Sequence, residues 1–224
     1  MKIIESKIEL EPIDGITIMK NIEKACRTCY RSEDKITEDS YKTLLKNCIT
    51  RGHFSVLEHE KVTVRLTLDV GAYKDLTRHR HANFSVESTR YCAYSKDKFG
   101  GQIKYIKPIF YNPDNDEKTK IWEQAMLDIE KQYMKMMELG STPDECRMLL
   151  PHSTAAEIVM TANIREWKHI FSLRAQKMTH PSIQQLMIPL LLYFKETMPE
   201  IFEDTEYNEN FDTNKYAKIE FING

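Results

Sequence analysis

The most regular alternation of apolar and polar residues lies in residues 61–70, KVTVRLTLDV. Every second residue from Val62 to Leu68 is apolar, and this period of two predicts a strand with one buried face. Weaker alternation, bounded by Gly, Pro or polar residues, predicts three further strands. They cover residues 2–10 (KIIESKIEL), 101–108 (GQIKYIKP) and 156–164 (AEIVMTANI).

Apolar residues three and four positions apart predict helices at residues 15–30, 37–52, 72–84, 115–139, 163–175 and 181–198, with a short helical turn at 142–151. Thr37 is expected to be the N-cap of the second helix, and Gly52 to end it. Asn163 is expected to start the fifth. The helix at 115–139 carries an apolar stripe that is typical of a core or an interface, formed by Trp122, Met126, Ile129, Tyr133, Met136 and Met137.

Strands and helices are interspersed, and no internal repeat or linker divides the chain. This order predicts a single α+β domain over residues 1–224, with a core at about 15–200. The polar residues 207–224 predict a weakly structured C-terminal tail. The longest apolar run, Leu186–Phe194, is too short to span a membrane and contains a proline. No membrane association is therefore expected.

The composition narrows the class of protein. The chain has 32 Lys and Arg and 34 Asp and Glu residues, a net charge of −2, whereas proteins that bind long nucleic acids are usually basic. Five cysteines and no apolar N-terminal segment indicate a reduced protein of the cytoplasm. Cys26 and Cys29 have the spacing of a redox pair or half a zinc site. They fall inside a helical pattern, however, and we interpret them as small, partly buried helix residues.

Planar cationic side chains are concentrated in residues 78–91, RHRHANFSVESTRY. Further along, Arg165 and His169 share one face of a predicted helix that also carries Arg174. Guanidinium groups bind phosphates and planar heterocycles through paired hydrogen bonds, and Ser88 and Thr89 could complete an anion-binding loop. The pattern predicts a site for a nucleotide or phosphorylated cofactor. A cationic surface patch balanced by nearby carboxylates is the alternative.

Other enzyme classes lack their motifs here. The chain contains no Gly-x-Gly-x-x-Gly, no Gly-x-x-x-x-Gly-Lys-Ser/Thr and no Gly-x-Ser-x-Gly. His53, His59, His79 and His81 form no His-Glu-x-x-His pair, and the neighbouring arginines would repel a cation. We expect no metal site.

Four segments together resemble one family. The chain contains Arg78-His79-Arg80, followed after seven residues by Ser88. This pattern is similar to the signature of the flavin-dependent thymidylate synthases. GHFSVLEH at 52–59 resembles the segment before that signature, and STRY at 88–91 its continuation. CRMLLP at 146–151 and TANIREWKHIFSLR at 161–174 resemble two later segments. Order and spacing agree over roughly residues 15–200.

The resemblance implies reductive methylation of dUMP to dTMP for the synthesis of dTTP. In that reaction 5,10-methylenetetrahydrofolate supplies the carbon, and NADPH reduces bound FAD, which carries the hydride. It also implies an α+β fold with a mixed or antiparallel sheet and several long helices. The chains of this family form a homotetramer with its sites at the subunit interfaces.

The resemblance also assigns roles to residues. Those expected to bind FAD are His53, Ser55, Arg78, His79, Arg80, His81, Asn163, Arg165 and His169. Those expected to bind dUMP are Asp75, Arg78, Val86, Glu87, Ser88, Thr89, Arg90, Arg147 and Arg174. Arg174 is the expected catalytic residue, because a guanidinium beside the uracil would stabilise the negative charge that develops on the ring.

Several positions depart from the family pattern, and the first is Asn83, which stands where Ser is common. Asp75 stands where Gln is common, and we expect it to contact Arg78 or the sugar. Ser85-Val86 replaces an Asn-Glu pair, so that the acid moves to Glu87, and His169 stands where Asn is also found. The departures at Asp75 and at Ser85-Val86 motivate an alternative hypothesis, a homologue that binds flavin without turnover. A nucleic-acid-binding module that uses the RHRH cluster is a further alternative.

Overall fold

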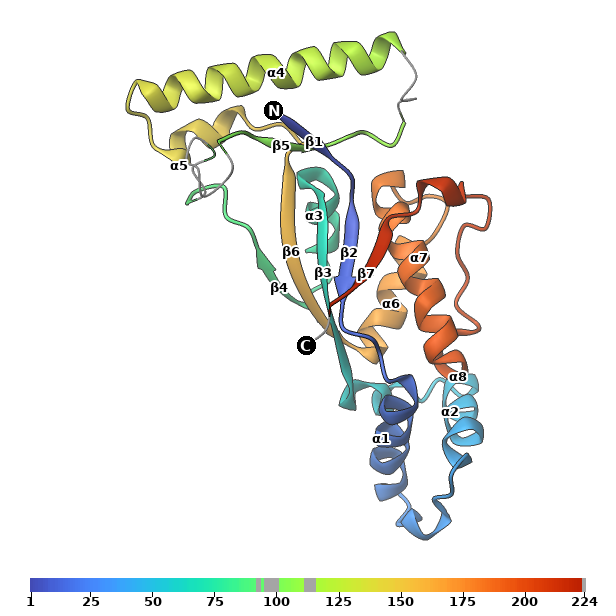
Figure 1. Cartoon of the computed structure of the whole chain (residues 1–224). Coiled ribbons are helices and arrows are strands. Elements are labelled where there is room, and N and C mark those ends of the chain that lie inside the picture. The colour runs from blue at the N-terminus through green and yellow to red at the C-terminus, as the bar shows by residue number, and fades with distance from the viewer. Residues whose placement is uncertain (92–93, 95–100, 111–115, 223–224) are drawn as a thin grey trace.

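The computed structural model describes residues 1–91, 94, 101–110 and 116–222 (Figure 1). Its main sheet has five strands in the order β4-β6-β3-β2-β7. All neighbours are antiparallel except β2 and β7, which are parallel. The strands are β2 (Lys7–Leu10), β3 (Lys61–Asp69), β4 (Asn83–Val86), β6 (Ala155–Asn163) and β7 (Lys218–Phe221). The predicted α+β class with a mixed sheet is confirmed.

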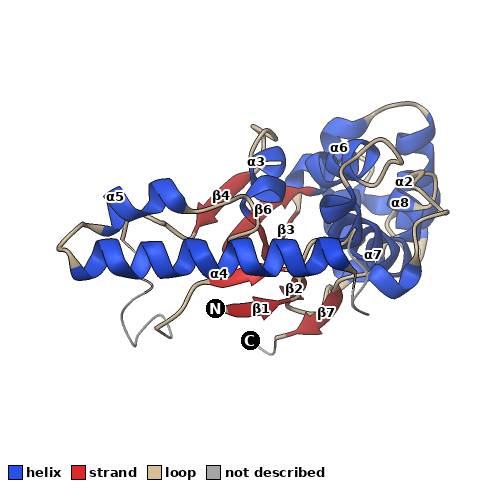
Figure 2. Cartoon of the chain, turned by 90° about the horizontal axis from the view of Figure 1, so that it is seen from above, coloured by secondary structure: helices blue, strands red, loops and turns tan. Residues whose placement is uncertain are grey.

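A second, two-stranded parallel sheet pairs β1 with β5. In Figure 1, α4 and α5 lie at the top of the molecule, and Figure 2 shows α2, α6, α7 and α8 gathered on one side. The bounds are β1 (Lys2–Ile4), β5 (Lys104–Ile106), α1 (Gly15–Thr28), α2 (Ser40–Thr50), α3 (Val70–Leu76), α4 (Glu117–Glu138), α5 (Pro143–Cys146), α6 (Ile164–Arg174), α7 (Pro181–Thr197) and α8 (Pro199–Phe202).

The main core lies between one face of the large sheet and helices α6 and α7. Alternate residues of β3 and β6 are buried there, as the period of two predicted. From α6 the core receives Trp167, whose indole N–H donates to the Val62 carbonyl at 3.0 Å, and Phe171. Helix α7 is buried on most of its surface. No helix in the described ranges is both long and apolar enough to cross a membrane.

The apolar stripe of α4 forms a second core, which confirms the prediction for this helix. Trp122, Met126 and Tyr133 are buried in it with Tyr105 of β5. The Trp122 indole donates to Ser153 Oγ at 3.1 Å. Asp116 caps the helix, and the predicted first residue, Asn115, lies outside the described residues.

Helix α1 begins in close contact with the end of α7. Gly15 is buried there, and a Cβ atom built on it would lie 2.0 Å from the backbone oxygen of Thr197 and 2.9 Å from Met198 Cγ. Only glycine fits, because real Cβ contacts are never that short. The contact fixes α1, which in turn packs against the short 3₁₀ helix Phe54–His59, named η2.

Several predicted elements are corrected by the structure. Residues 2–10 form two strands in different sheets rather than one, and Thr37 is not the N-cap of α2, because Asp39 holds that position. The helix predicted at 72–84 ends at Leu76, and residues 83–86 pair with β6 as an edge strand. The tail predicted to be weakly structured contains β7. Gly52 does end the second helical segment, with φ +71°.

The cysteines differ in their burial and in their neighbours. Cys26 is buried and Cys29 is exposed, although they lie on one helical turn. The Cys26 thiol instead lies 3.8 Å from that of Cys48, sulfur to sulfur, and burial raises the pKa of Cys48 to about 11. Cys92 lies outside the described residues.

Candidate functional site

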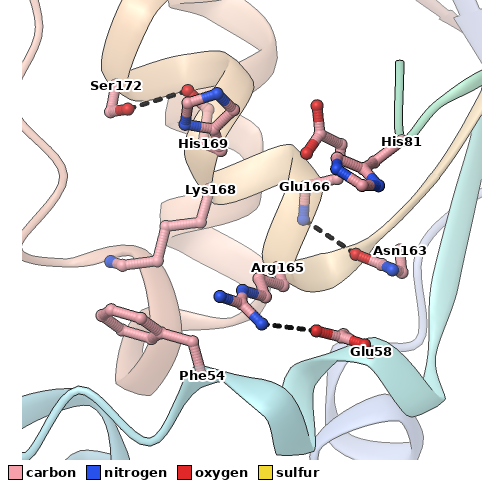
Figure 3. A pocket seen from close by; sticks show the side chains of 9 residues that line it. All are labelled: Phe54, Glu58, His81, Asn163, Arg165, Glu166, Lys168, His169 and Ser172. Carbon is pink, nitrogen blue, oxygen red and sulfur yellow. Dashed lines mark hydrogen bonds and ion pairs between the residues drawn. The ribbon is translucent and has the colours of Figure 1, made fainter. Parts of the chain in front are cut away.

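A cavity of about 750 Å³ lies between η2, the turn after α3 and the outer face of α6 (Figure 3). These three segments are distant in the sequence, and each carries part of the family resemblance. The lining residues are Phe54, Glu58, His81, Asn163, Arg165, Glu166, Lys168, His169 and Ser172.

Helix α6 divides its residues between the cavity and the core. Arg165, Lys168, His169 and Ser172 follow the three- and four-residue spacing of one helix face, and all four line the cavity. The opposite face carries Trp167 into the core. Asn163 starts the helix as predicted, and its side chain accepts from the Glu166 N–H at 2.8 Å.

The cavity offers cationic donors beside an aromatic ring. Phe54, Arg165 and Lys168 point into the same open region (Figure 3). Arg165 Nη1 lies 2.5 Å from Glu58 Oε1, so part of its charge is balanced. Lys168 Nζ donates to the Ile201 carbonyl at 2.8 Å and also contacts Asp204. Such a set can hold a flat ring and an anionic group together.

His79 connects the turn after α3 to both ends of α6. Its ring is buried, and its Nε2 atom accepts from Arg174 Nε at 3.0 Å. Its Nδ1 atom lies 3.2 Å from Glu166 Oε1. Arg174 Nη2 also donates to the Asp75 carbonyl at 2.9 Å. The Asp75 carbonyl also accepts from the Arg78 N–H at 3.4 Å, so Asp75 contacts Arg78 through its backbone, and its expected contact with the sugar stays a prediction.

Burial, together with the positive charge of Arg174 and the nearby His169, lowers the pKa of His79 to about 4. The ring is therefore neutral near pH 7. A neutral ring whose Nε2 accepts a hydrogen bond carries its proton on Nδ1. The contact with Glu166 is thus a hydrogen bond from a neutral N–H to a carboxylate, not an ion pair.

This pKa predicts how stability depends on pH. Between pH 6.5, where a free histidine titrates, and about pH 4, the unfolded chain binds a proton that folded His79 does not. Stability should therefore fall as the pH decreases, by at most about 1.4 kcal/mol per pH unit from this ring. Urea unfolding of the wild type and His79→Gln from pH 7 to 4.5 measures the difference. Identical pH dependence in both proteins would contradict the prediction.

The other expected FAD residues lie around the cavity but do not line it. His53 and Ser55 are exposed at the start of η2, just after Gly52. Arg78 and Arg80 are exposed on either side of buried His79. The structure thus brings His81, Asn163, Arg165 and His169 together in one cavity and leaves these four nearby on the surface.

A second cluster gathers two of the expected dUMP residues. The Nε atoms of Arg90 and Arg147 each lie 3.1 Å from the same oxygen of Asp144, Oδ1. Ser88 Oγ accepts from the Arg90 N–H at 3.4 Å. Thr89, which lies between Ser88 and Arg90 in the sequence, is half-buried.

Residues 86 and 87 are less available than the sequence predicted. Val86 pairs with Ile158 in the sheet, and the Glu87 N–H donates to the Glu157 carbonyl at 2.8 Å. The sheet therefore already uses the backbone N–H of Glu87, and the expected contact of this residue with dUMP stays a prediction. In the sequence, Ser88 and Thr89 come directly after this last backbone hydrogen bond of the sheet.

His79, Glu166 and His169 also meet the donor requirements of a metal site. Their ligand atoms lie within 4.8 Å of one another. Arg174 donates to the same imidazole, however, and its charge opposes a second cation. We assign the three side chains to hydrogen bonding, and the expected absence of a metal stays a prediction.

A family model for the thymidylate synthase complementing proteins matches residues 16–200. The chain belongs to this family. Relatives include the flavin-dependent thymidylate synthase of Geobacter sulfurreducens, 28% identical over 187 residues that cover 80% of this chain and 78% of the relative. The enzyme of the same name from Halobacterium salinarum is 29% identical over 187 residues, covering 75% and 76%. The resemblance found in the sequence is confirmed.

Two solved structures share the fold. The UMP/dUMP methylase PolB from Streptomyces cacaoi, bound with 5-Br dUMP, has a TM-score of 0.73 and 20% identity, covering 91% of this chain and 96% of that one. Thymidylate synthase X from Helicobacter pylori, with FAD and dUMP, has a TM-score of 0.68 and 20% identity, covering 89% and 98%.

Several residues of the candidate site in this member of the thymidylate synthase complementing family were not predicted from the sequence. Phe54 and Glu58 lie inside the GHFSVLEH segment, so the motif itself contained the signal. Lys168 and Ser172 follow Arg165 at helical spacing and could have been found from the helix face. The spacing in the sequence did not reveal that Asp144 joins Arg90 to Arg147.

Proposed function

We propose that this chain converts dUMP to dTMP as a flavin-dependent thymidylate synthase. The carbon comes from 5,10-methylenetetrahydrofolate and the reducing equivalents from NADPH through FAD. The observation that carries the proposal is the cavity on α6, in which segments of three family motifs meet. The shared name of the relatives supports the same reaction.

The cavity fits FAD by the chemistry of its donors. FAD has a flat ring system and an anionic pyrophosphate, which suit Phe54 and the cationic side chains of Arg165 and Lys168. When bound, it would supply the hydride chemistry. The residues that we assign to FAD are His53, Ser55, Arg78, His79, Arg80, His81, Asn163, Arg165 and His169, with Phe54, Lys168 and Ser172 added.

The Arg90 and Arg147 cluster suits the phosphate and sugar of dUMP. The guanidinium groups of Arg90 and Arg147 share the carboxylate of Asp144. They can give up part of this contact and bind a phosphate instead, with Ser88 and Thr89 beside them. The wider dUMP set keeps Asp75, Arg78, Val86 and Glu87. Arg174 is placed at the uracil, where its guanidinium favours the negative charge that develops on the ring.

We also propose a homotetramer in the cytoplasm, with its sites completed between subunits and residues 1–224 forming one domain. Within the described residues, no hydrogen bond or ion pair joins Arg174 to the Arg90 and Arg147 cluster. A neighbouring subunit could supply the missing half. Exposed apolar side chains on α4, such as Ile121 and Leu127, support an interface.

An assay of the purified protein tests the function. We expect a yellow protein with the absorption of oxidised flavin, which forms dTMP from dUMP, NADPH and methylenetetrahydrofolate without oxygen. Reactions lacking NADPH or folate are the controls, and UMP in place of dUMP tests the nucleotide, because one neighbour is named a UMP/dUMP methylase. Protein that cannot bind FAD would refute the proposal. Flavin binding without any product would identify a homologue without turnover.

A further inference from the structure

Glu166 is a buried acid whose carboxylate is not used by its own helix. It occupies the third position of α6 and exposes 6% of its surface. A glutamate at this position often completes a capping box by accepting from the N-cap N–H. The Asn163 side chain does accept from the Glu166 backbone, but the Glu166 carboxylate contacts the ring of His79 at 3.2 Å. A buried carboxylate turned away from the helix end needs another reason.

The contact fixes which nitrogen of His79 carries the proton. A carboxylate only accepts hydrogen bonds, so Nδ1 must donate to Glu166. In a neutral ring Nε2 then has a free lone pair, which accepts from Arg174 Nε at 3.0 Å. The opposite tautomer would set an N–H of His79 against an N–H of Arg174. Glu166 therefore selects the only tautomer that holds Arg174.

Arg174 is in this way held on two sides. Nε donates to His79, and Nη2 donates to the Asp75 carbonyl. Within the described part of the chain, Nη1 makes no hydrogen bond. The guanidinium is thus anchored by one edge and presents the other. The loop itself is fixed, since the His79 N–H donates to the Leu76 carbonyl and the Ala82 N–H to the His79 carbonyl.

We propose that Glu166 is a positioning residue for the thymidylate synthase reaction. Through His79 it orients the guanidinium of Arg174 toward the nucleotide, without touching the reacting atoms. The inference rests on the proposed function, because it gives Arg174 a substrate to face. It adds to the site an acid that the family motifs did not assign.

Two variants test separately whether the acceptor oxygen or the negative charge of Glu166 is required. Glu166→Ala removes the acceptor, whereas Glu166→Gln keeps an oxygen that can accept from Nδ1. In FAD-loaded Glu166→Ala we expect kcat to fall by about tenfold or more, as when a catalytic histidine loses the partner that fixes its tautomer. The KM for dUMP and the Kd for FAD should change by less than about threefold. Glu166→Gln should recover most of kcat.

Glu23→Ala is the matched control. Glu23 is also a buried helical acid, paired with Arg27 at 2.7 Å, but it lies on α1 outside the cavity. It should lose stability and keep kcat per bound FAD. In addition, ¹⁵N spectra of histidine-labelled holoenzyme, with the His79 signal assigned through His79→Gln, should show the proton on Nδ1 in the wild type and a mixture of tautomers in Glu166→Ala.

The outcomes are distinct. A folded, FAD-loaded Glu166→Ala with kcat within about twofold of wild type would overturn the proposal, as would a Glu166→Gln that is equally impaired. Unchanged His79 tautomers in Glu166→Ala would do the same. If the wild type makes no dTMP, the proposed function fails first, and the nitrogen signals alone then decide whether Glu166 sets the His79 tautomer.

Discussion

Arg174→Ala is expected to bind FAD normally and to lose about 100- to 1,000-fold in kcat, the usual cost of removing one donor that stabilises developing charge. The side chain leaves α6 at its last residue and is anchored on His79 and Asp75 rather than on the cavity wall. Its loss should therefore affect the reaction more than flavin binding. Single-turnover assays and titration with FAD measure the two effects separately.

Arg174→Lys and Lys177→Ala are the comparison variants. Lysine keeps the charge but lacks the fork that reaches His79 and Asp75 together, so it should restore only part of kcat. Lys177 is an exposed cation three residues further along, and its loss should change nothing. Full activity in Arg174→Ala would remove this residue from the mechanism.

Gly15→Ala is expected to lower the free energy of unfolding by about 3 kcal/mol or more. The added methyl would lie 2.0 Å from a backbone oxygen of α7, and backbone cannot turn aside as a side chain can. Either α1 or the end of α7 must then move. Since α1 packs against η2, which carries Phe54 and Glu58, FAD affinity should fall as well. Urea denaturation followed by circular dichroism measures the stability.

Gly140→Ala separates this clash from backbone strain. Gly140 ends α4 with φ +92°, and a Cβ there would meet nothing within 4 Å. Alanine should cost about 1–2 kcal/mol through strain alone. If both variants lose the same free energy of unfolding, steric overlap is not the reason why Gly15 cannot be replaced.

Elements with a strong periodicity and their own end signals could be predicted from the sequence. Residues 61–70 alternate regularly and residues 156–164 more weakly, because one face of each strand packs on the core, and both strands were predicted. Asn163 and Gly52 marked a helix start and a helix end through local hydrogen bonding and backbone geometry.

Elements decided by distant partners were missed. Residues 83–86 continue a helical pattern, but their hydrogen bonds to β6 make them a strand. Residues 218–221 look polar and weak, yet β2 gives them a partner. Residues 2–10 were predicted as one strand, and nothing local shows that the chain changes sheets between Ile4 and Lys7.

The site was predictable to the extent that it resembles a family. The motifs pointed to Arg165, His169 and Arg174, and α6 does place the first two in the cavity and the third against His79. The link between Arg174 and Glu166 was not visible, because it passes through a ring from another segment. Asp144 was missed for the same reason: it is 54 residues from the Arg90 that it contacts.

The pairing of β7 with β2 has a consequence for how the chain folds. It joins residues 7–10 to residues 218–221, from opposite ends of the sequence. During synthesis on the ribosome, β2 can find β3 early, but its other edge stays open until nearly all of the chain has emerged. Contacts of such long sequence separation form slowly, and open edges invite pairing with other chains. We therefore expect newly made chains to be most prone to aggregate before residues 218–221 have paired with β2.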